Sequence, residues 1–137
     1  MTDPICPAGT LPRPDPRLWL GCTVTMETDR PIGYTHTKNG NTFTYPINYG
    51  YIPGVTGGDG EELDVYLLGV DRPVRRLTGI IIGAVVRTDD EEDKLVMAPT
   101  GVRCTAAEIR EAVHFQEKYH SSYILTAPEQ SRTATTE

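Results

Sequence analysis

Residues 45–68 read YPINYGYIPGVTGGDGEELDVYLL, and the rest of the chain is best interpreted around this segment. It begins with tyrosines and a proline, passes through a glycine-rich turn and ends in an apolar run. The turn carries four carboxylates within six positions: Asp59, Glu61, Glu62 and Asp64. Because like charges repel and a desolvated charge is costly, such a cluster requires either surrounding water or a cation that neutralises it.

A second acidic segment, DDEED at residues 89–93, is followed directly by Lys94. We interpret the two acidic segments as two walls of one metal site. Hard divalent ions such as Mg²⁺ take oxygen ligands from one or two carboxylates, keep several waters and bridge to phosphates. The alternative is two solvated acidic loops, since charge blocks usually face the solvent. A calcium-binding EF-hand loop is a weaker alternative, because Asp59-Gly60-Glu61 does not supply its ligand pattern.

The apolar pattern around these segments predicts β-strands. Residues 18–27 alternate towards their end, as expected of a half-buried strand, and residues 78–86 (TGIIIGAVV) form a buried, β-branched run. In residues 62–69 one face is apolar throughout, and both faces are apolar beyond Asp64. This pattern indicates the wall of a closed barrel that is packed inside and covered outside. A further strand is expected at residues 94–98.

Two local motifs predict a hairpin and a helix. Asn39-Gly40 is a strong hairpin turn, because both residues tolerate positive φ. Thr105 and Glu108 have the spacing of a capping box, which predicts a helix from there to about residue 120. Helical spacing then gives this helix a stripe that faces the barrel. The stripe comprises Ile109, Ala112, Val113, Gln116 and His120.

The charge, the apolar runs and the cysteines of the chain exclude several classes of function. The net charge of −6 and the pI near 5.0 argue against a nucleic-acid partner, and an acidic chain needs metal ions before an anionic substrate can approach. No apolar run is long enough for a membrane span, and no signal peptide is evident. The three cysteines, Cys6, Cys22 and Cys104, have neither zinc spacing nor a disulfide framework. We therefore expect a cytoplasmic protein without disulfides.

Three motifs in order, YPINYGYI, DGEELDVYLLG and DDEEDKLV, resemble the soluble inorganic pyrophosphatases of the small β-barrel type, family I. The resemblance extends over about residues 23–119. It implies a mainly β (α+β) fold: a small closed OB-like β-barrel of about five to six strands with one C-terminal helix packed against it. We expect a proline-rich arm at residues 1–17, the barrel domain at 18–125 and a polar tail at 126–137.

The resemblance also implies an activity and a partner. The activity is hydrolysis of inorganic pyrophosphate to two phosphates by metal-activated water, without a covalent intermediate. The cofactor would be Mg²⁺, with Mn²⁺ able to substitute, and the chain would assemble as a homo-oligomer. Two metals close together would bind the attacking and leaving oxygens and lower the pKa of the water between them.

The resemblance assigns roles to residues that match the family motifs, in the mouth of the barrel. The metal ligands would be Asp59, Asp64 and Asp89, with Glu92 for a further metal, Asp90 and Asp93 as alternatives, and Glu27 facing the cavity from the first strand. For Glu27 a solvated strand-edge position is an equal alternative. Glu61 would accept the proton of the attacking water, and the Tyr49 hydroxyl would contact phosphate or metal-bound water. Lys94 would neutralise the product phosphate; the alternative is a salt bridge within DDEED.

The chain departs from the family in its cationic phosphate contacts. A lysine after the first strand and an arginine two strands later are missing, so Lys38, Arg30 and His36 are the candidates for the lost positive charge. At the end of the helix Tyr119 matches a family tyrosine, but His120 stands where a lysine is expected. A neutral imidazole carries no fixed charge, which would weaken substrate binding. The expected substrate contacts are Lys38, Tyr119, His120 and Lys94.

These departures leave two other functions open. The first is a phosphohydrolase that acts on another diphosphate substrate. The second is a non-catalytic barrel that binds metal or phosphate. Phosphate release from pyrophosphate, measured beside a panel of nucleotides with and without a chelator, separates them.

Overall fold

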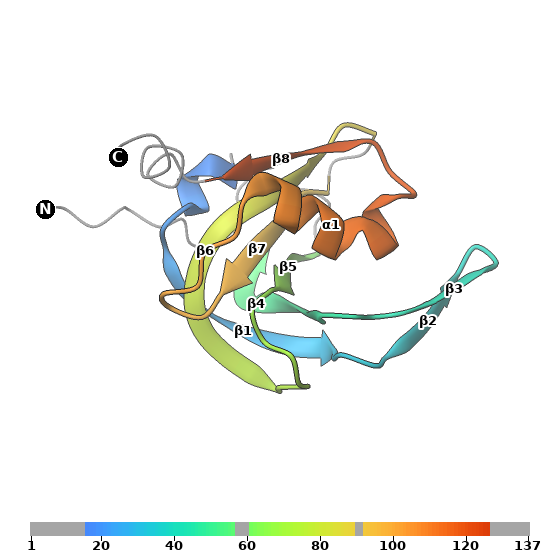
Figure 1. The fold of residues 1–137 in the computed structure, drawn as a ribbon, viewed down its shortest axis with the longest axis horizontal. Helices are drawn as coiled ribbons and strands as arrows, with labels where there is room; N and C mark the ends of the chain where they lie inside the picture. Colours follow the sequence, from blue (N-terminus) through green and yellow to red (C-terminus); the bar gives the residue numbers. More distant parts are fainter. Residues whose placement is uncertain (1–15, 57–60, 90–91, 127–137) are drawn as a thin grey trace, which may run out of the picture.

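The computed structural model describes residues 16–56, 61–89 and 92–126, and within them the chain is mainly β with one helix near the C-terminus (Figure 1). The predicted fold class is confirmed. The elements in order are the 3₁₀ helix η1 (Pro16–Trp19), β1 (Thr23–Arg30), β2 (Thr35–Lys38), β3 (Asn41–Thr44), β4 (Asn48–Thr56), β5 (Glu62–Leu67), β6 (Arg76–Arg87), β7 (Lys94–Ala98), α1 (Ala106–Glu117) and β8 (Ser122–Thr126).

The barrel consists of five strands in the order β1-β4-β5-β7-β6, closed by pairing of β6 with β1. The β5–β7 pair is parallel and the other neighbours in the barrel are antiparallel. The long strand β6 has a divided edge: its first half pairs with β1 and its second half with β8. β8 is not predicted from the sequence, because this strand is only five residues long and acquires its partner from β6, which lies far away in the sequence.

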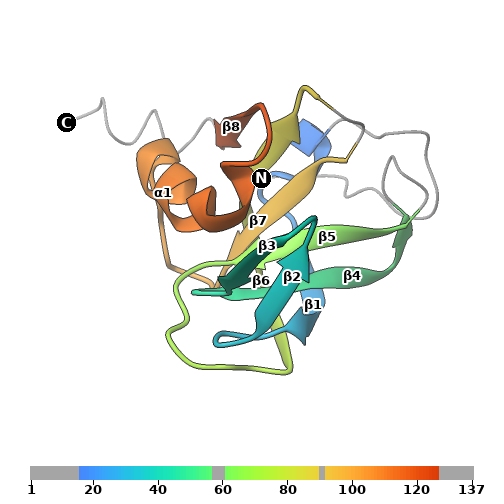
Figure 2. The ribbon, with the colours of Figure 1, turned by 90° about the vertical axis from the view of Figure 1, so that its right-hand side faces the viewer.

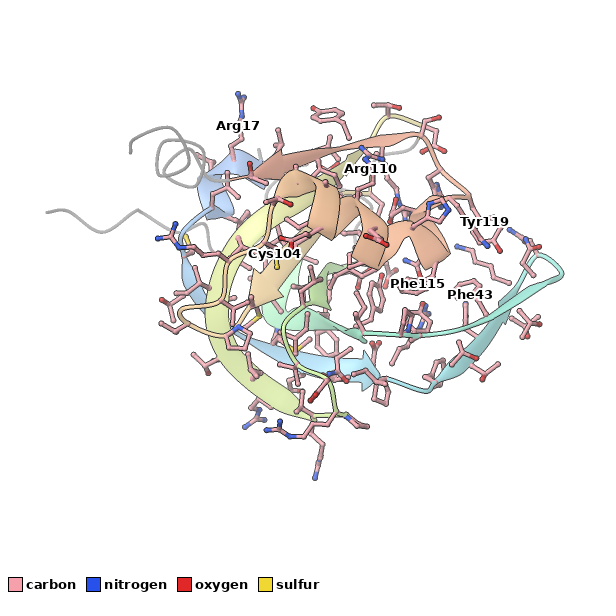
Figure 3. The ribbon with its side chains drawn as sticks, in the orientation of Figure 1. Arg17, Phe43, Cys104, Arg110, Phe115 and Tyr119 are labelled. Carbon is pink, nitrogen blue, oxygen red and sulfur yellow. The ribbon has the colours of Figure 1, made fainter. Side chains whose placement is uncertain are left out.

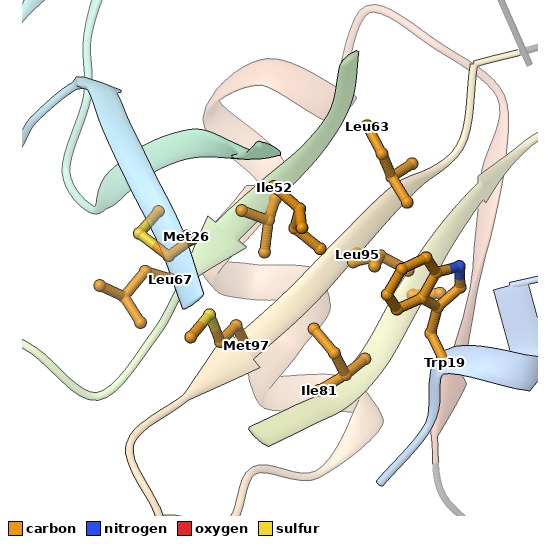
Figure 4. Close-up of a cluster of buried hydrophobic side chains, with 10 residues drawn as sticks. Trp19, Met26, Ile52, Leu63, Leu67, Ile81, Leu95 and Met97 are labelled. Carbon is orange, nitrogen blue, oxygen red and sulfur yellow. The ribbon is translucent and has the colours of Figure 1, made fainter. Parts of the chain in front are cut away.

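The interior of the barrel is filled by apolar side chains from all five of its strands and from η1 (Figure 4). These side chains are Trp19, Met26, Ile52, Leu63, Val65, Leu67, Ile81, Ala84, Leu95 and Met97. A second buried cluster lies on the opposite face of the wall, where Tyr66 and Val96 pack with Ile109 and Val113 of α1. The barrel wall is thus packed on both faces, as predicted from residues 62–69, and α1 covers its outer face (Figure 2).

The β2–β3 hairpin extends from the barrel and turns at Asn39 and Gly40, which have φ values of 54° and 80° (Figure 1). This confirms the predicted turn. One face of the hairpin carries threonine pairs joined by hydroxyl hydrogen bonds. The opposite face carries His36 and Phe43, which stand directly across from each other. Because residues alternate between faces, the hairpin presents an aromatic face to the rest of the molecule.

The helix begins with the predicted capping box. The Thr105 side chain accepts from the Glu108 amide at 3.1 Å, and the Glu108 carboxylate accepts from the Thr105 amide at 2.8 Å. The helix ends at Glu117, three residues before the predicted end, because residues 118–120 form a turn that leads into β8. None of the described helices is long and apolar enough to cross a membrane.

The cysteines differ from expectation. Cys22 is disulfide-bonded, so the expectation that the chain has no disulfide is wrong for this residue, whereas Cys104 is a free thiol. The sparse spacing of three cysteines gave no signal of a pairing, which depends on the tertiary structure. The cytoplasmic location, which rested partly on this expectation, stays a prediction.

Candidate active site

A cavity of about 640 Å³ lies between the outer face of the barrel wall, the hairpin and the C-terminal end of α1. Its lining combines cations, carboxylates and aromatic rings. The lining residues are Arg30, His36, Thr37, Lys38, Asn39, Asn41, Phe43, Tyr49, Asp64, Arg87, Glu92, Lys94, Gln116, Tyr119 and His120.

Three adjacent strands place Tyr49, Asp64 and Lys94 together at this cavity. Lys94 Nζ donates to the Tyr49 hydroxyl at 2.6 Å and to Asp64 Oδ2 at 2.9 Å, and the Tyr49 hydroxyl donates to the same Asp64 oxygen at 2.9 Å. On each strand, these residues alternate with side chains that fill the barrel. The cluster therefore lies outside the barrel wall and not in the barrel's mouth, where we expected it.

Glu92 completes this polar cluster. Its carboxylate accepts from Lys94 at 2.8 Å and from Arg87 Nη1 at 2.9 Å, and it also contacts Asp64. Burial opposes ionisation of Glu92, but the charge of Lys94, with help from Arg87, outweighs it and lowers the pKa to about 2. For Asp64, burial dominates and raises the pKa. Two carboxylates thus share one cavity wall, and the ammonium of Lys94 donates to both.

Arg87 and Glu117 form a buried base beneath the cluster. Arg87 donates to both carboxylate oxygens of Glu117, at 3.1 and 2.8 Å, and the Tyr66 hydroxyl donates to Glu117 at 2.7 Å. Arg87 and Glu117 are not predicted site residues. Helical spacing could have found Glu117, which lies four residues after Val113 and therefore on the buried stripe.

From Tyr66 the hydrogen-bond chain continues along the cavity towards the hairpin. Gln116 donates to the Tyr66 hydroxyl at 2.8 Å and accepts from the Tyr45 hydroxyl at 2.6 Å. The Tyr45 hydroxyl in turn accepts from Arg30 Nη1 at 2.6 Å. Residues of β1, β5, α1 and the loop before β4 are thus held in one network, which fixes the shape of this wall.

The remaining predicted substrate contacts also line the cavity. Lys38 lies at the end of β2, and Tyr119 and His120 follow α1. The Tyr119 ring lies 6.0 Å from the Phe43 ring, and Figure 3 shows both between the hairpin and the end of α1. His120 contacts Asp89 through Nδ1 at 3.3 Å.

Three predicted residues that the structure describes, Asp89, Glu27 and Glu61, do not line this cavity. Asp89 accepts from the Ser121 amide at 3.2 Å and is not a lining residue. Glu27 lies at a separate depression, paired with Arg76 at 2.7 Å and accepting from the Tyr51 hydroxyl at 3.3 Å. Glu61 is exposed immediately before β5, and Asp59 lies outside the described residues.

The carboxylates that line the cavity are the side chains that could bind a divalent cation. Within residues 16–56, 61–89 and 92–126, no group of three or more His, Cys, Asp or Glu side chains is arranged to hold a metal. Asp64 and Glu92 nevertheless place two carboxylates in contact at the cavity. This set fits Mg²⁺, which binds through one or two carboxylates and fills its remaining positions with water and phosphate oxygens.

Comparison with known proteins gives a consistent result. The family model described as inorganic pyrophosphatase matches residues 21–123. The inorganic pyrophosphatase of Ehrlichia chaffeensis has a similar structure, with a TM-score of 0.59 and 16% identity over 88% of this chain and 94% of that one. The inorganic pyrophosphatase of Coxiella burnetii has a TM-score of 0.54 and 17% identity over 76% of this chain and 83% of that one. No curated protein sequence matches.

Proposed function

Because the chain belongs to the inorganic pyrophosphatase family, we propose that it hydrolyses inorganic pyrophosphate to two phosphates at the cavity between the barrel wall, the hairpin and α1. Water attacks one phosphorus atom directly, the bridging P–O bond breaks, and no covalent intermediate forms. The proposed cofactor is Mg²⁺, with Mn²⁺ able to substitute. We further propose that the chain acts in the cytoplasm as a homo-oligomer.

The observation that carries the proposal is the cluster of Asp64, Glu92, Lys94 and Tyr49. These residues come from separate family-like motifs and meet within hydrogen-bond distance at a cavity lined by further cations. A bound divalent cation supplies positive charge to the phosphates and lowers the pKa of water. Asp64 and Glu92 are the described residues that would hold it, with Asp59 and Asp89 as further proposed ligands.

The residues of the chain would bind and orient the substrate. The Lys94 ammonium is almost fully buried, at 3% exposure, and its three N–H donors are held by three acceptors, so its position is fixed. It would contact the substrate by exchanging one of these acceptors for a phosphate oxygen. The Tyr49 hydroxyl is held beside it. Lys38, Tyr119 and His120 would contact the substrate from the opposite rim. Glu61 remains the proposed proton acceptor.

A second candidate function is favoured by the aromatic rim of the same cavity. Phe43, Tyr119 and His36 line it, and the exposed fraction of the Tyr119 side chain is 44%. Phosphate has no apolar surface that such rings could contact, whereas a nucleobase stacks on them. The alternative substrate is therefore an organic diphosphate whose aromatic group lies on this rim, cleaved at the same phosphoanhydride bond.

The test is phosphate release by the purified protein with pyrophosphate and nucleoside diphosphates, in millimolar Mg²⁺ and with a chelator. We expect Mg²⁺-dependent release from pyrophosphate, which the chelator abolishes. Asp64→Asn should abolish release and Asp71→Asn, an equal charge change at an exposed turn, should not. Release only from the nucleotides would favour the organic substrate, and release from neither would exclude both hydrolytic functions.

A further inference from the structure

We infer that Arg30 binds a phosphate group of the substrate, in place of the cations that this chain lacks relative to its family. This inference rests on the proposed function and assigns a specific contact within it. Arg30 lines the cavity from the end of β1. The sequence left it as one of three candidates, with Lys38 and His36.

A β-bulge places Arg30 at the cavity. β1 pairs with β4 so that Thr28 stands opposite Gly50, but Arg30 stands opposite Tyr49, which leaves Asp29 as an extra residue in β1. Without the bulge, regular pairing would place Asp29 opposite Tyr49 and direct the Arg30 side chain to the other face. The bulge therefore puts a cation where regular pairing would put a carboxylate, and bulges commonly re-aim a side chain in this way next to active sites.

Tyr45 and Gln116 of α1 fix the orientation of the Arg30 guanidinium. Its Nη1 donates to the Tyr45 hydroxyl at 2.6 Å, and that hydroxyl is fixed by Gln116 at 2.6 Å. The guanidinium carbon lies 5.7 Å from the centroid of the Tyr45 ring and 5.5 Å from that of Tyr49. A guanidinium has five N–H donors in a fixed fork, so the contact with Tyr45 leaves donors for a phosphate.

The two cations near the Tyr49 ring differ in their ion pairs. Lys94 Nζ lies 5.2 Å from the centroid of the ring that Arg30 contacts. Lys94 is paired with Asp64 and Glu92, and the third cation of the wall, Arg87, is paired with Glu117 and Glu92. Among the described residues no carboxylate forms an ion pair with Arg30. A phosphate can therefore balance the charge of Arg30 without displacing a described carboxylate from it.

The other two candidates are less suited to this contact. Burial, and then the positive charges of Arg30 and Lys38, lower the pKa of His36, so its imidazole is mainly neutral at neutral pH. Lys38 is exposed at the outer end of the hairpin and is a point charge on a flexible stem. A planar guanidinium matches two phosphate oxygens at once.

The experiment compares Arg30→Gln and Arg30→Lys with Arg103→Gln, which removes an equal charge at an exposed position outside the cavity lining. We measure kcat and KM for pyrophosphate, binding of inorganic phosphate by calorimetry in Mg²⁺, and Tm. Arg30→Gln should raise both KM and the Kd for phosphate about 10- to 100-fold, the loss expected for hydrogen bonds to a charged group. Tm should change little, Arg30→Lys should restore part of the binding, and Arg103→Gln should match the wild type.

Two outcomes would overturn the inference: values of KM and phosphate Kd within about twofold of wild type in Arg30→Gln, or an equal loss in Arg103→Gln. If Arg30→Gln does not fold, Tyr45→Phe removes the orienting hydroxyl but keeps the ring. This variant should raise the phosphate Kd, and an unchanged Kd would count against the inference. If the wild type releases no phosphate the proposed function fails, and the phosphate Kd then decides the role of Arg30 by itself.

Discussion

Arg87 and Glu117 form a two-point ion pair between the end of β6 and the last residue of α1, with side chains only 3% and 5% exposed. The pair joins the helix to the wall of the cavity, because Arg87 also donates to Glu92. Buried ion pairs add little net stability relative to apolar residues, since desolvation offsets their attraction. The Arg87–Glu117 pair instead fixes positions, because it holds one edge of the proposed site against α1.

Glu117→Gln should lower the free energy of unfolding by about 3 kcal/mol, because it removes the more deeply buried of the two carboxylates that pair with Arg87. Urea unfolding monitored by circular dichroism measures the change. Glu27→Gln is the matched control, since it breaks an exposed ion pair with Arg76 and such pairs contribute little. Equal effects of the two substitutions would contradict the buried role of Glu117.

The stability of the metal-free protein should depend on pH through Glu92. Its pKa is about 2 in the folded chain and near 4.5 when unperturbed, so the folded state favours the ionised form. The stabilisation is fully present above about pH 4.5 and is lost as the pH falls towards 2. Unfolding in a chelator should show a smaller decline over this range for Glu92→Gln than for the wild type. Parallel curves for the two proteins would rule out this contribution.

Gly50→Ala should destabilise the barrel by about 3 kcal/mol or more, because a Cβ there would lie 1.9 Å from the Glu27 carbonyl oxygen in the neighbouring strand. Backbone cannot move aside as a flexible side chain can. Gly101→Ala is the comparison: its φ of 92° is unfavourable for alanine, but a Cβ there has no neighbour within 4 Å. The cost at Gly101 should be only about 1–2 kcal/mol. A smaller loss at Gly50 than at Gly101 in thermal unfolding would show that β1 can separate from β4.

Glu92→Gln and Asp89→Asn distinguish the two acidic residues that were both proposed as metal ligands. Glu92 contacts Asp64 at the cavity, whereas Asp89 is bound by His120 and the Ser121 amide. We expect Glu92→Gln to raise the Mg²⁺ concentration needed for half-maximal activity at least about tenfold, and Asp89→Asn to have the smaller effect. Activity against Mg²⁺ concentration and calorimetric Mn²⁺ binding measure both. A larger rise in the required Mg²⁺ concentration for Asp89→Asn than for Glu92→Gln would indicate that Asp89 is the metal ligand.

Sequence reasoning predicted the features that are set by local pattern. Alternation along residues 62–69 predicted a wall with two buried faces, Asn39-Gly40 predicted the hairpin, and the capping box predicted the start of the helix. Each depends on neighbours in the chain, so the residues involved carry the information themselves. The motifs also indicated the pyrophosphatase family, which the comparisons confirm.

The composition of the site was less predictable. Packing of α1 against the barrel brings Gln116 to the cavity and Glu117 to Arg87 of β6, and β8 depends on an edge of β6 that no local pattern reveals. Glu27 shares a strand with Arg30, yet lies at a different depression. Sequence spacing could not separate these positions, because the bulge at Asp29 changes which side chain stands next to Tyr49.

The sequence by itself determined most of the strands, the turn, the helix and the family, because periodicity, turn chemistry and motif order act over short stretches of chain. Only the tertiary structure decided which charged side chains meet. The reason is that strand register and the docking of α1 set the distances between residues far apart in sequence, and electrostatic and hydrogen-bond contacts depend on those distances within a few tenths of an ångström.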